Sequence, residues 1–204
     1  MPERSEKHSR SELLLQKHET ARKFAEAYNP DIQVLCAENL ERTFMGDAPT
    51  IGLLNRTYTP RQVRTWLIVQ LENLNDYVGT KNKMEPNQMQ MLAEVITTEF
   101  YYLKASELLL FFHQFKSGKY GELYGSVDPL RITSALQSFC VYRREKLSVY
   151  ERVANEEKRE QSEQERLKNA ISYEEYKQQK RLKQKNKLIR LKLDGRVRIK
   201  NRKV

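Results

Sequence analysis

The chain has 204 residues, of which 39% are hydrophobic and 31% are charged. This length fits one ordinary domain with tails, and a content of only seven glycines and six prolines favours a helical protein. The longest uninterrupted apolar run, Leu108–Phe112, is much shorter than the roughly 20 residues that cross a bilayer, so we expect no membrane-spanning segment.

The N-terminal residues lack the apolar core of a signal peptide, and the two cysteines lie far apart. We therefore expect a cytoplasmic protein in which Cys36 and Cys140 are reduced thiols. The cysteines and histidines do not show the spacing of a zinc site, so no metal is predicted.

The net charge of +10 is concentrated near the C-terminus. Residues 177–204 contain 13 Lys or Arg and one acid, Asp194, whereas residues 1–176 contain 24 basic and 26 acidic residues. A polycationic tail on a nearly neutral body indicates a polyanionic partner. The tail lacks the bulky aromatic residues of an interfacial anchor, which favours nucleic acid over an anionic membrane.

The polar residues 1–9 predict a flexible N-terminus, which is followed by an all-α helical body over residues 10–150. We expect a first helix from Ser11 to Asn29-Pro30, and then a short helix that carries Val34, Leu35 and Leu40. The apolar linker 48–55 is expected to pack on the body.

Two longer helices are predicted next. The first begins at Thr59-Pro60 and ends at Gly79, with apolar residues at a period near 3.6 and Gln70 as the one polar intruder. The second begins at Glu85-Pro86 and runs to Lys116, and its apolar stripe widens near the C-terminal end, which indicates burial on several sides.

The segment 115–129 is rich in Gly and Tyr and predicts the tight connection of a central αα-hairpin. Gly118, Gly121 and Gly125 allow a sharp turn. Asp128-Pro129 is typical of a helix N-cap followed by proline in the first turn.

Two tyrosines in this turn, Tyr120 and Tyr124, allow two interpretations. They either brace the connection, or offer a rigid aromatic surface to a partner protein or a nucleic-acid base. We favour the structural interpretation, because a tight turn between helices requires these residue types in any case.

Beyond the hairpin, residues 151–186 predict a solvated, charged helix with few core contacts. Residues 187–204 form a basic arm in which apolar and basic residues alternate around Asp194-Gly195, the signal of a β-hairpin. The register that pairs Leu193 with Val197 keeps the two faces distinct. An isolated hairpin is marginal in water, and the sequence leaves open whether it forms without a partner.

No residue pattern indicates catalysis. His113 lies between apolar residues and is interpreted as a histidine at the edge of the core. The serines and glycines match neither the hydrolase nucleophile elbow nor a phosphate-binding loop. We therefore predict a non-enzymatic protein without a cofactor.

The predicted nucleic-acid interface consists of the basic residues of the charged helix and the arm. Arg and Lys without base-reading motifs indicate phosphate-directed, salt-sensitive binding. The residues are Lys180, Arg181, Lys183, Lys185, Lys187, Arg190, Lys192, Arg196, Arg198 and Lys200.

Residues 48–144 also resemble an uncharacterised family of small helical proteins encoded by phage-like and conjugative elements of gut anaerobes. The resemblance is carried by Ala48-Pro49-Thr50, Trp66-Leu67, Glu107–Phe112 and above all by the GKYG…YGSVDP pattern of residues 118–129. It covers about half of the chain and implies no catalytic residue. More loosely, a helical body with a basic tail is similar to phage replicative-helicase loaders.

These observations lead to one preferred function and one alternative. We expect a DNA-associated accessory protein of a mobile element, acting in replication, whose body contacts a protein such as a replicative helicase. The alternative is a structural or adaptor protein whose basic tail docks on an acidic protein surface. Binding of the isolated tail to DNA or to an acidic protein distinguishes the two.

Overall fold

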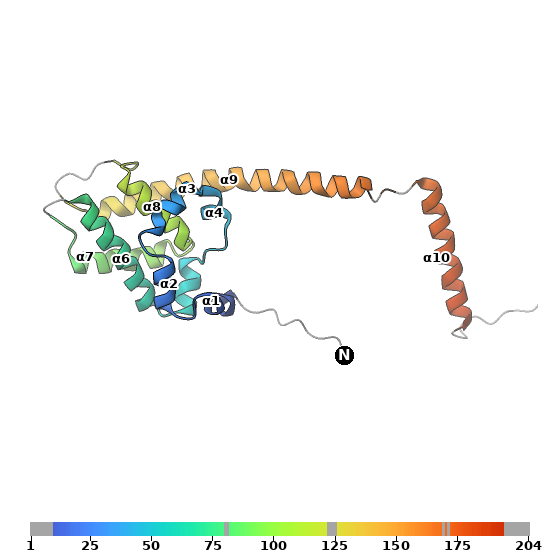
Figure 1. Ribbon diagram of the computed structural model, residues 1–204, viewed down its shortest axis with the longest axis horizontal. Helices are drawn as coiled ribbons and strands as arrows, with labels where there is room; N and C mark the ends of the chain where they lie inside the picture. The colour runs from blue at the N-terminus through green and yellow to red at the C-terminus, as the bar shows by residue number, and fades with distance from the viewer. Residues whose placement is uncertain (1–9, 80–81, 122–125, 169, 171, 194–204) are drawn as a thin grey trace, which may run out of the picture. The chain divides into compact units, whose positions relative to one another are not determined.

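Helices form most of the chain, as Figure 1 shows for the computed structural model. The structure describes residues 10–79, 82–121, 126–168, 170 and 172–193, and within them it has ten helices and no extended strand, so the predicted all-α fold is confirmed. The chain divides into two compact units, residues 1–152 and residues 153–204. Among the described residues, no helix combines the length and the apolar character needed to cross a bilayer.

The first unit contains α1 to α8 and the first part of α9, and the second contains the rest of α9 and α10. The helices are α1 (Arg10–His18), α2 (Ala21–Ala27), α3 (Ile32–Glu38), α4 (Leu40–Met45), α5 (Ile51–Thr57), α6 (Pro60–Val78), α7 (Pro86–Glu99), α8 (Ala105–Lys116), α9 (Pro129–Lys168) and α10 (Tyr173–Leu193).

α8 is the central helix of the first unit. Ten of its twelve residues are buried, and the side chains of the run from Leu108 to Phe112 have no exposed area. Because nearly all of this helix is buried, neighbouring elements must cover it on almost every side. α3, α4 and α6 pack on it, and Figure 1 shows α3 beside α8. Burial of each large apolar side chain contributes about 1.5–3 kcal/mol.

α9 lies antiparallel to α8 and completes this cover. The ring centroids of Phe111 on α8 and Phe139 on α9 are 5.7 Å apart. One helical turn away on each helix, Nε of Arg143 donates to Oε1 of Glu107 at 2.8 Å. Glu107 precedes Phe111 on α8, whereas its partner Arg143 follows Phe139 on α9, so the two helices run in opposite directions. They form the predicted αα-hairpin.

Glu107 places a carboxylate inside the apolar core, with no exposed area. Besides the ion pair with Arg143, its Oε2 accepts a hydrogen bond from the backbone N–H of Lys104 at 2.8 Å and so caps α8. Buried charges are tolerated when they are paired and hydrogen-bonded, and Glu107 meets both conditions.

α6 matches the helix predicted between Thr59 and Gly79. Thr59 and Gln62 form a capping box, Pro60 occupies the first turn, and Gly79 ends the helix at φ 63°. The polar intruder Gln70 has no exposed area, and its Oε1 accepts from Nε2 of Gln33 at 2.9 Å. The buried side-chain amide of Gln70 is therefore hydrogen-bonded to a second amide, that of Gln33 on α3.

The single helix predicted from Glu85 to Lys116 is wrong, because α7 ends at Glu99 and α8 begins at Ala105. The intervening backbone bonds to the segment around the start of α5 instead. The N–H of Ile51 donates to the carbonyl of Leu103 at 2.9 Å, and that of Gly52 to the carbonyl of Tyr101 at 2.7 Å. These tertiary hydrogen bonds replace the hydrogen bonds of a continuous helix. The apolar periodicity of the sequence does not indicate the replacement, because it continues through this interval.

The N-terminal helices also differ from the prediction. α1 ends at His18, Glu19 adopts a φ of 47°, and the Oγ1 of Thr20 caps the new helix α2 by accepting from the N–H of Lys23. The single short helix expected next is two helices, α3 and α4, separated at Asn39. The linker 48–55, in contrast, packs on the body as predicted, because Ile51 and Leu54 are fully buried.

The turn between α8 and α9 contains two glycines with positive φ, Gly118 at 79° and Gly121 at 88°. Gly125 and Tyr124 lie outside the described residues. At the end of the turn, Oδ1 of Asp128 accepts from the N–H of Leu130 at 2.8 Å, and α9 begins at Pro129.

Replacement of Arg143 by Met tests whether the buried ion pair holds α9 on α8. We expect the free energy of unfolding to fall by about 3 kcal/mol or more, because Glu107 would remain buried without its partner. Arg144→Met is the matched control, since Arg144 is exposed, and should change stability by less than about 0.5 kcal/mol. Urea titration measures both, and equal stability of the two variants would show that the pair does not hold the helices together.

Gly118 tests the backbone of the turn. A Cβ at this position would meet no neighbouring atom within 4 Å, so any cost of substitution comes from its φ of 79°. Gly118→Ala should reduce stability by about 1 kcal/mol. Gly118→Asn should cost less, because Asn adopts positive φ more readily. Equal stability of the Ala variant and the unchanged protein in urea would exclude this conformation.

Candidate nucleic-acid interface

α10 forms for local reasons. Ser172 and Glu175 make a capping box, in which Oγ of Ser172 accepts from the N–H of Glu175 and Oε2 of Glu175 accepts from the N–H of Ser172. Glu174 and Glu175 in the first turn favour the positive end of the helix dipole. The residues that follow are mostly Lys, Arg, Gln and Leu, which are good helix formers.

The predicted β-hairpin in the arm is wrong over its first strand, because residues 188–193 belong to α10. The alternation of apolar and basic residues there is outweighed by the strong helix propensity of Leu, Lys and Arg and by the helix that already precedes them. Residues 194–204 lie outside the described part of the chain. The charged helix predicted over 151–186 is also interrupted, since α9 ends at Lys168 and α10 begins at Tyr173.

The basic residues of α10 form two rows. Lys180, Lys183, Lys187 and Arg190 recur at helical spacing along one side of the helix. A second row contains Lys177, Arg181, Lys185 and Lys192. With 3.6 residues per turn, the two rows are separated by about 140° around the helix axis.

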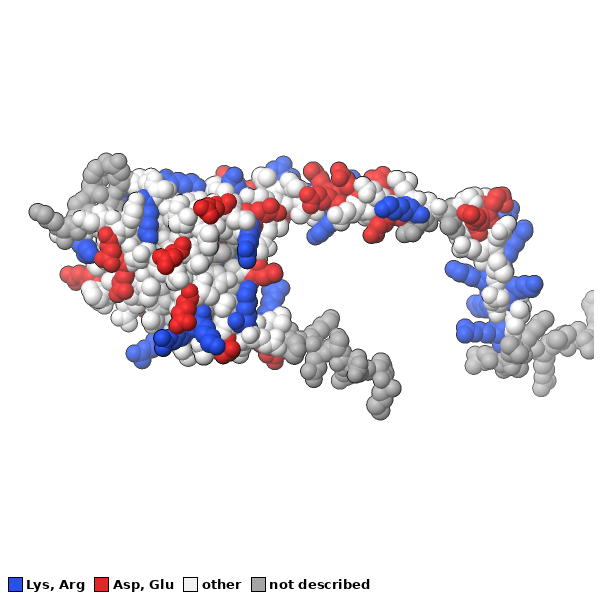
Figure 2. Space-filling model, viewed as in Figure 1, with Lys and Arg blue, Asp and Glu red and all other residues white. Residues whose placement is uncertain are grey.

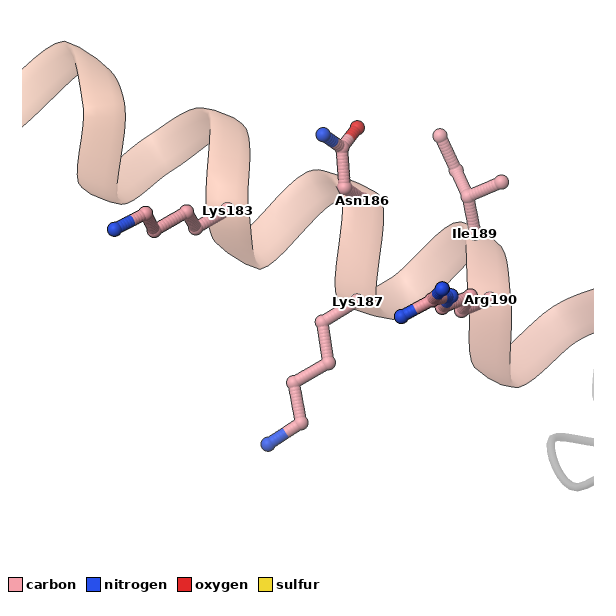
Figure 3. Close-up of a pocket in the computed structure, with 5 residues that line it drawn as sticks. All are labelled: Lys183, Asn186, Lys187, Ile189 and Arg190. Atoms are coloured by element: carbon pink, nitrogen blue, oxygen red, sulfur yellow. The ribbon is translucent and has the colours of Figure 1, made fainter. Parts of the chain in front are cut away.

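On the side of the helix away from the shorter arc between the two rows lies an uncharged strip. It contains Leu182, Asn186 and Ile189, and Figure 3 shows Asn186 and Ile189 on the opposite side of the helix from Lys187. Leu182 and Ile189 are each about half exposed. The strip is therefore a narrow uncharged face with two apolar residues, and the two basic rows lie on either side of it.

The side chains drawn in Figure 3 surround a shallow hollow of about 530 Å³. All five lining residues, Lys183, Asn186, Lys187, Ile189 and Arg190, come from α10 itself. Within the described part of the chain, the lining is therefore a single face of one helix. The arrangement is an exposed face that suits an extended anion.

The charge on α10 is nearly of one sign, with eight basic and two acidic residues. Within the part of the chain that the structure describes, none of the basic side chains of α10 forms an ion pair. The preceding part of α9 is different, because residues 153–168 contain five acidic and four basic residues. Figure 2 shows this contrast as mixed red and blue on α9 and predominantly blue on α10.

The structure thus brings together six of the predicted interface residues as described side chains: Lys180, Arg181, Lys183, Lys185, Lys187 and Arg190. Lys192 lies on α10, but its side chain is not described. Arg196, Arg198 and Lys200 lie outside the described residues. The prediction omitted Lys177, although its spacing of four residues before Arg181 places it in the same row.

Tyr120, predicted as a brace or as a partner contact, packs inward. Its hydroxyl donates to Oε1 of Gln114 at 2.7 Å, and its ring lies 5.6 Å from that of Phe111 between centroids. Burial raises the pKa of Tyr120 above its ordinary value. These contacts favour the structural interpretation of this tyrosine.

The histidines and cysteines do not gather into a site within the described residues. Across those residues, no group of three or more His, Cys, Asp or Glu side chains is placed to hold a metal ion. His113 is half-buried on α8, and Cys36 and Cys140 are free thiols. Burial raises the pKa of Cys36, which leaves its thiol less reactive than an ordinary cysteine.

Comparison with known proteins identifies one family. The profile of a family of unknown function (DUF6633) matches residues 83–187, which include α7, α8, α9 and most of α10. Neither the comparison with curated proteins nor that with solved structures gives a match.

A proline at Gln184 tests whether α10 is a helix that stands apart from the core. Gln184→Pro removes a helical hydrogen bond and clashes with the preceding turn, so far-UV circular dichroism should show a loss of helix. The urea midpoint should not change, because the described side chains of α10 up to Arg190 are all exposed. Gln184→Ala is the control and should retain the helix. A shift of the midpoint in the proline variant would place α10 in the cooperative core.

Proposed function

We propose that this chain, which belongs to the family of unknown function DUF6633, is a non-enzymatic nucleic-acid-binding protein that holds DNA through α10 and the basic residues after it. The observation that carries the proposal is the exposed, nearly single-sign charge of α10, whose basic side chains find no acidic partner among the described residues. Repulsion between these charges is relieved when a polyanion supplies the counter-charge.

The dimensions of α10 support a duplex as ligand. Its 21 residues extend over about 31 Å at 1.5 Å per residue. B-DNA carries one phosphate per about 1.7 Å of its axis, so the phosphates outnumber the basic residues along this length. The major groove admits an α-helix, and two basic rows about 140° apart direct side chains to the phosphates on both sides of the groove.

An anionic membrane fits α10 less well. An interfacial helix buries a broad apolar face, whereas the apolar residues of α10 form only the narrow strip at Leu182 and Ile189 or are scattered around the helix. A small-molecule substrate also fits poorly, because the described lining of the hollow comes from α10 alone. Nucleic acid is the ligand that matches both the charge and the shape.

We further propose that the protein is an accessory factor in the replication of a mobile element in the cytoplasm. In this role the body contacts a protein such as a replicative helicase, while α10 and the arm hold DNA. The support for it is the sequence resemblance described above.

The salt dependence of DNA binding tests this function. Four to six phosphate contacts should give a slope of log affinity against log salt of about −4 to −5 for duplex DNA. The triple variant Lys183→Gln, Lys187→Gln, Arg190→Gln should flatten the slope by about 2 to 3 and weaken binding similarly across sequences. Fluorescence anisotropy with labelled duplexes at several salt concentrations measures both.

The matched control removes three positive charges from α9 instead, as Lys158→Gln, Arg159→Gln, Arg166→Gln. Because those residues lie among acidic neighbours, the control should retain the slope of the unchanged protein. Equal weakening in both triple variants would show that net charge, and not α10, governs binding. Binding to an acidic polypeptide without binding to DNA would instead support the adaptor function.

A further inference from the structure

A groove on the first unit lies between the turn after α8 and the first turns of α9. It has a volume of about 610 Å³, and its lining includes Lys119, Tyr120, Arg131, Ser134, Ser138 and Tyr142. The residues from α9 recur at helical spacing on one side of the helix, next to the face that packs on the core. Unlike the hollow on α10, this groove therefore has walls from two parts of the chain.

Lys119 is held in the groove by neutral groups. Its Nζ lies 3.3 Å from the ring centroid of Tyr142 and 3.1 Å from Oε1 of Gln114. Burial and the nearby charge of Lys146 lower the pKa of Lys119. An ammonium carries three donors, and the amide oxygen of Gln114 accepts one of them.

Arg131 adds a second cation from the first turn of α9. Its Nη2 lies 3.2 Å from the position that a Cβ on Gly121 would occupy, so the guanidinium crosses the turn where a glycine leaves room for it. Lys146 lies one turn beyond Tyr142, with Nζ 5.7 Å from the centroid of that ring.

Hydroxyl groups complete the lining. Ser134 and Ser138 are exposed on α9, and each hydroxyl donates to the backbone carbonyl four residues earlier in the helix, so its oxygen can still accept or exchange a hydrogen bond. Lysine, arginine and hydroxyl side chains around one space are the groups that proteins use to bind phosphate oxygens.

We infer that this groove binds a phosphate group, as a second anion site separate from α10. Lys119 and Arg131 supply the charge, and the serine hydroxyls of α9 lie beside them. The ligand is either a backbone phosphate of a nucleic acid or a free phosphate compound, since both present the same oxygens. The site stands independently of whether α10 binds DNA.

Isothermal titration of the full-length protein with pyrophosphate at constant ionic strength tests the groove. Ser138→Glu places a carboxylate among the two cations and removes nothing from the core, because Ser138 is exposed. We expect it to weaken pyrophosphate binding at least about tenfold, the loss that one charge-assisted hydrogen bond represents. Gln137→Glu is the matched control, since it adds the same charge at the neighbouring exposed position outside the lining.

Lys119→Gln is a second, independent variant that should also weaken pyrophosphate binding. Lys119→Arg keeps the charge and should retain pyrophosphate binding. The α10 triple variant Lys183→Gln, Lys187→Gln, Arg190→Gln should retain pyrophosphate affinity, which separates this site from the proposed DNA interface. Absence of pyrophosphate binding, equal losses in Ser138→Glu and Gln137→Glu, or a loss only in the α10 variant would each overturn the inference.

A short oligothymidylate identifies the source of the phosphate. If it displaces pyrophosphate and Ser138→Glu weakens its own binding, the groove holds a nucleic-acid backbone. If pyrophosphate binds in the groove and the oligonucleotide does not displace it, the ligand is a free phosphate compound. Both results support a phosphate site.

Discussion

The burial of α8 is the constraint on which the rest of the first unit depends. Ten of the twelve residues of this helix are buried, so it must be covered on almost every side, and α3, α4, α6 and α9 provide this cover. Glu107 determines which face of α9 packs on α8, because a carboxylate with no exposed area needs a charged partner. Arg143 on α9 provides this partner. The same interaction fixes the register of the αα-hairpin, and with it the position of Lys119 and Tyr120 in the groove for which we infer phosphate binding.

α10, in contrast to α8, is specified by local signals and not by burial. Its capping box and helix formers suffice to specify a helix, and no described side chain up to Arg190 is buried. A segment whose described side chains are exposed can carry charge of one sign, which would destabilise a packed body through repulsion. Apolar burial therefore stabilises the body, whereas the exposed charge of α10 supports the proposal that this helix binds a polyanion.

The sequence predicted those parts of the fold for which local signals and periodicity agree. For α6, a Thr-Pro start, a 3.6 period and a terminal glycine all indicate the same helix, and the structure has it. The prediction of a helix through Phe100–Lys104 failed because apolar periodicity continues through this interval, whereas its backbone carbonyls accept hydrogen bonds from Ile51 and Gly52. Contacts between residues 50 positions apart leave no local signature. The basic residues of α10 were found from composition, and a helix was predicted as far as residue 186. The last turns of α10, residues 188–193, were predicted as a strand instead, because alternation was given more weight than propensity.

Hydrogen exchange of the full-length protein, measured by mass spectrometry with and without duplex DNA, tests the central claim most directly. The account predicts that DNA slows exchange of the amides of residues 173–193, because neutralised charges stabilise a helix whose described side chains up to Arg190 are exposed. The amides of α8 should exchange at the same rate in both conditions, since its stability comes from the core. Slower exchange confined to the body, with α10 unchanged at saturating DNA, would contradict the claim that α10 is the DNA-binding element.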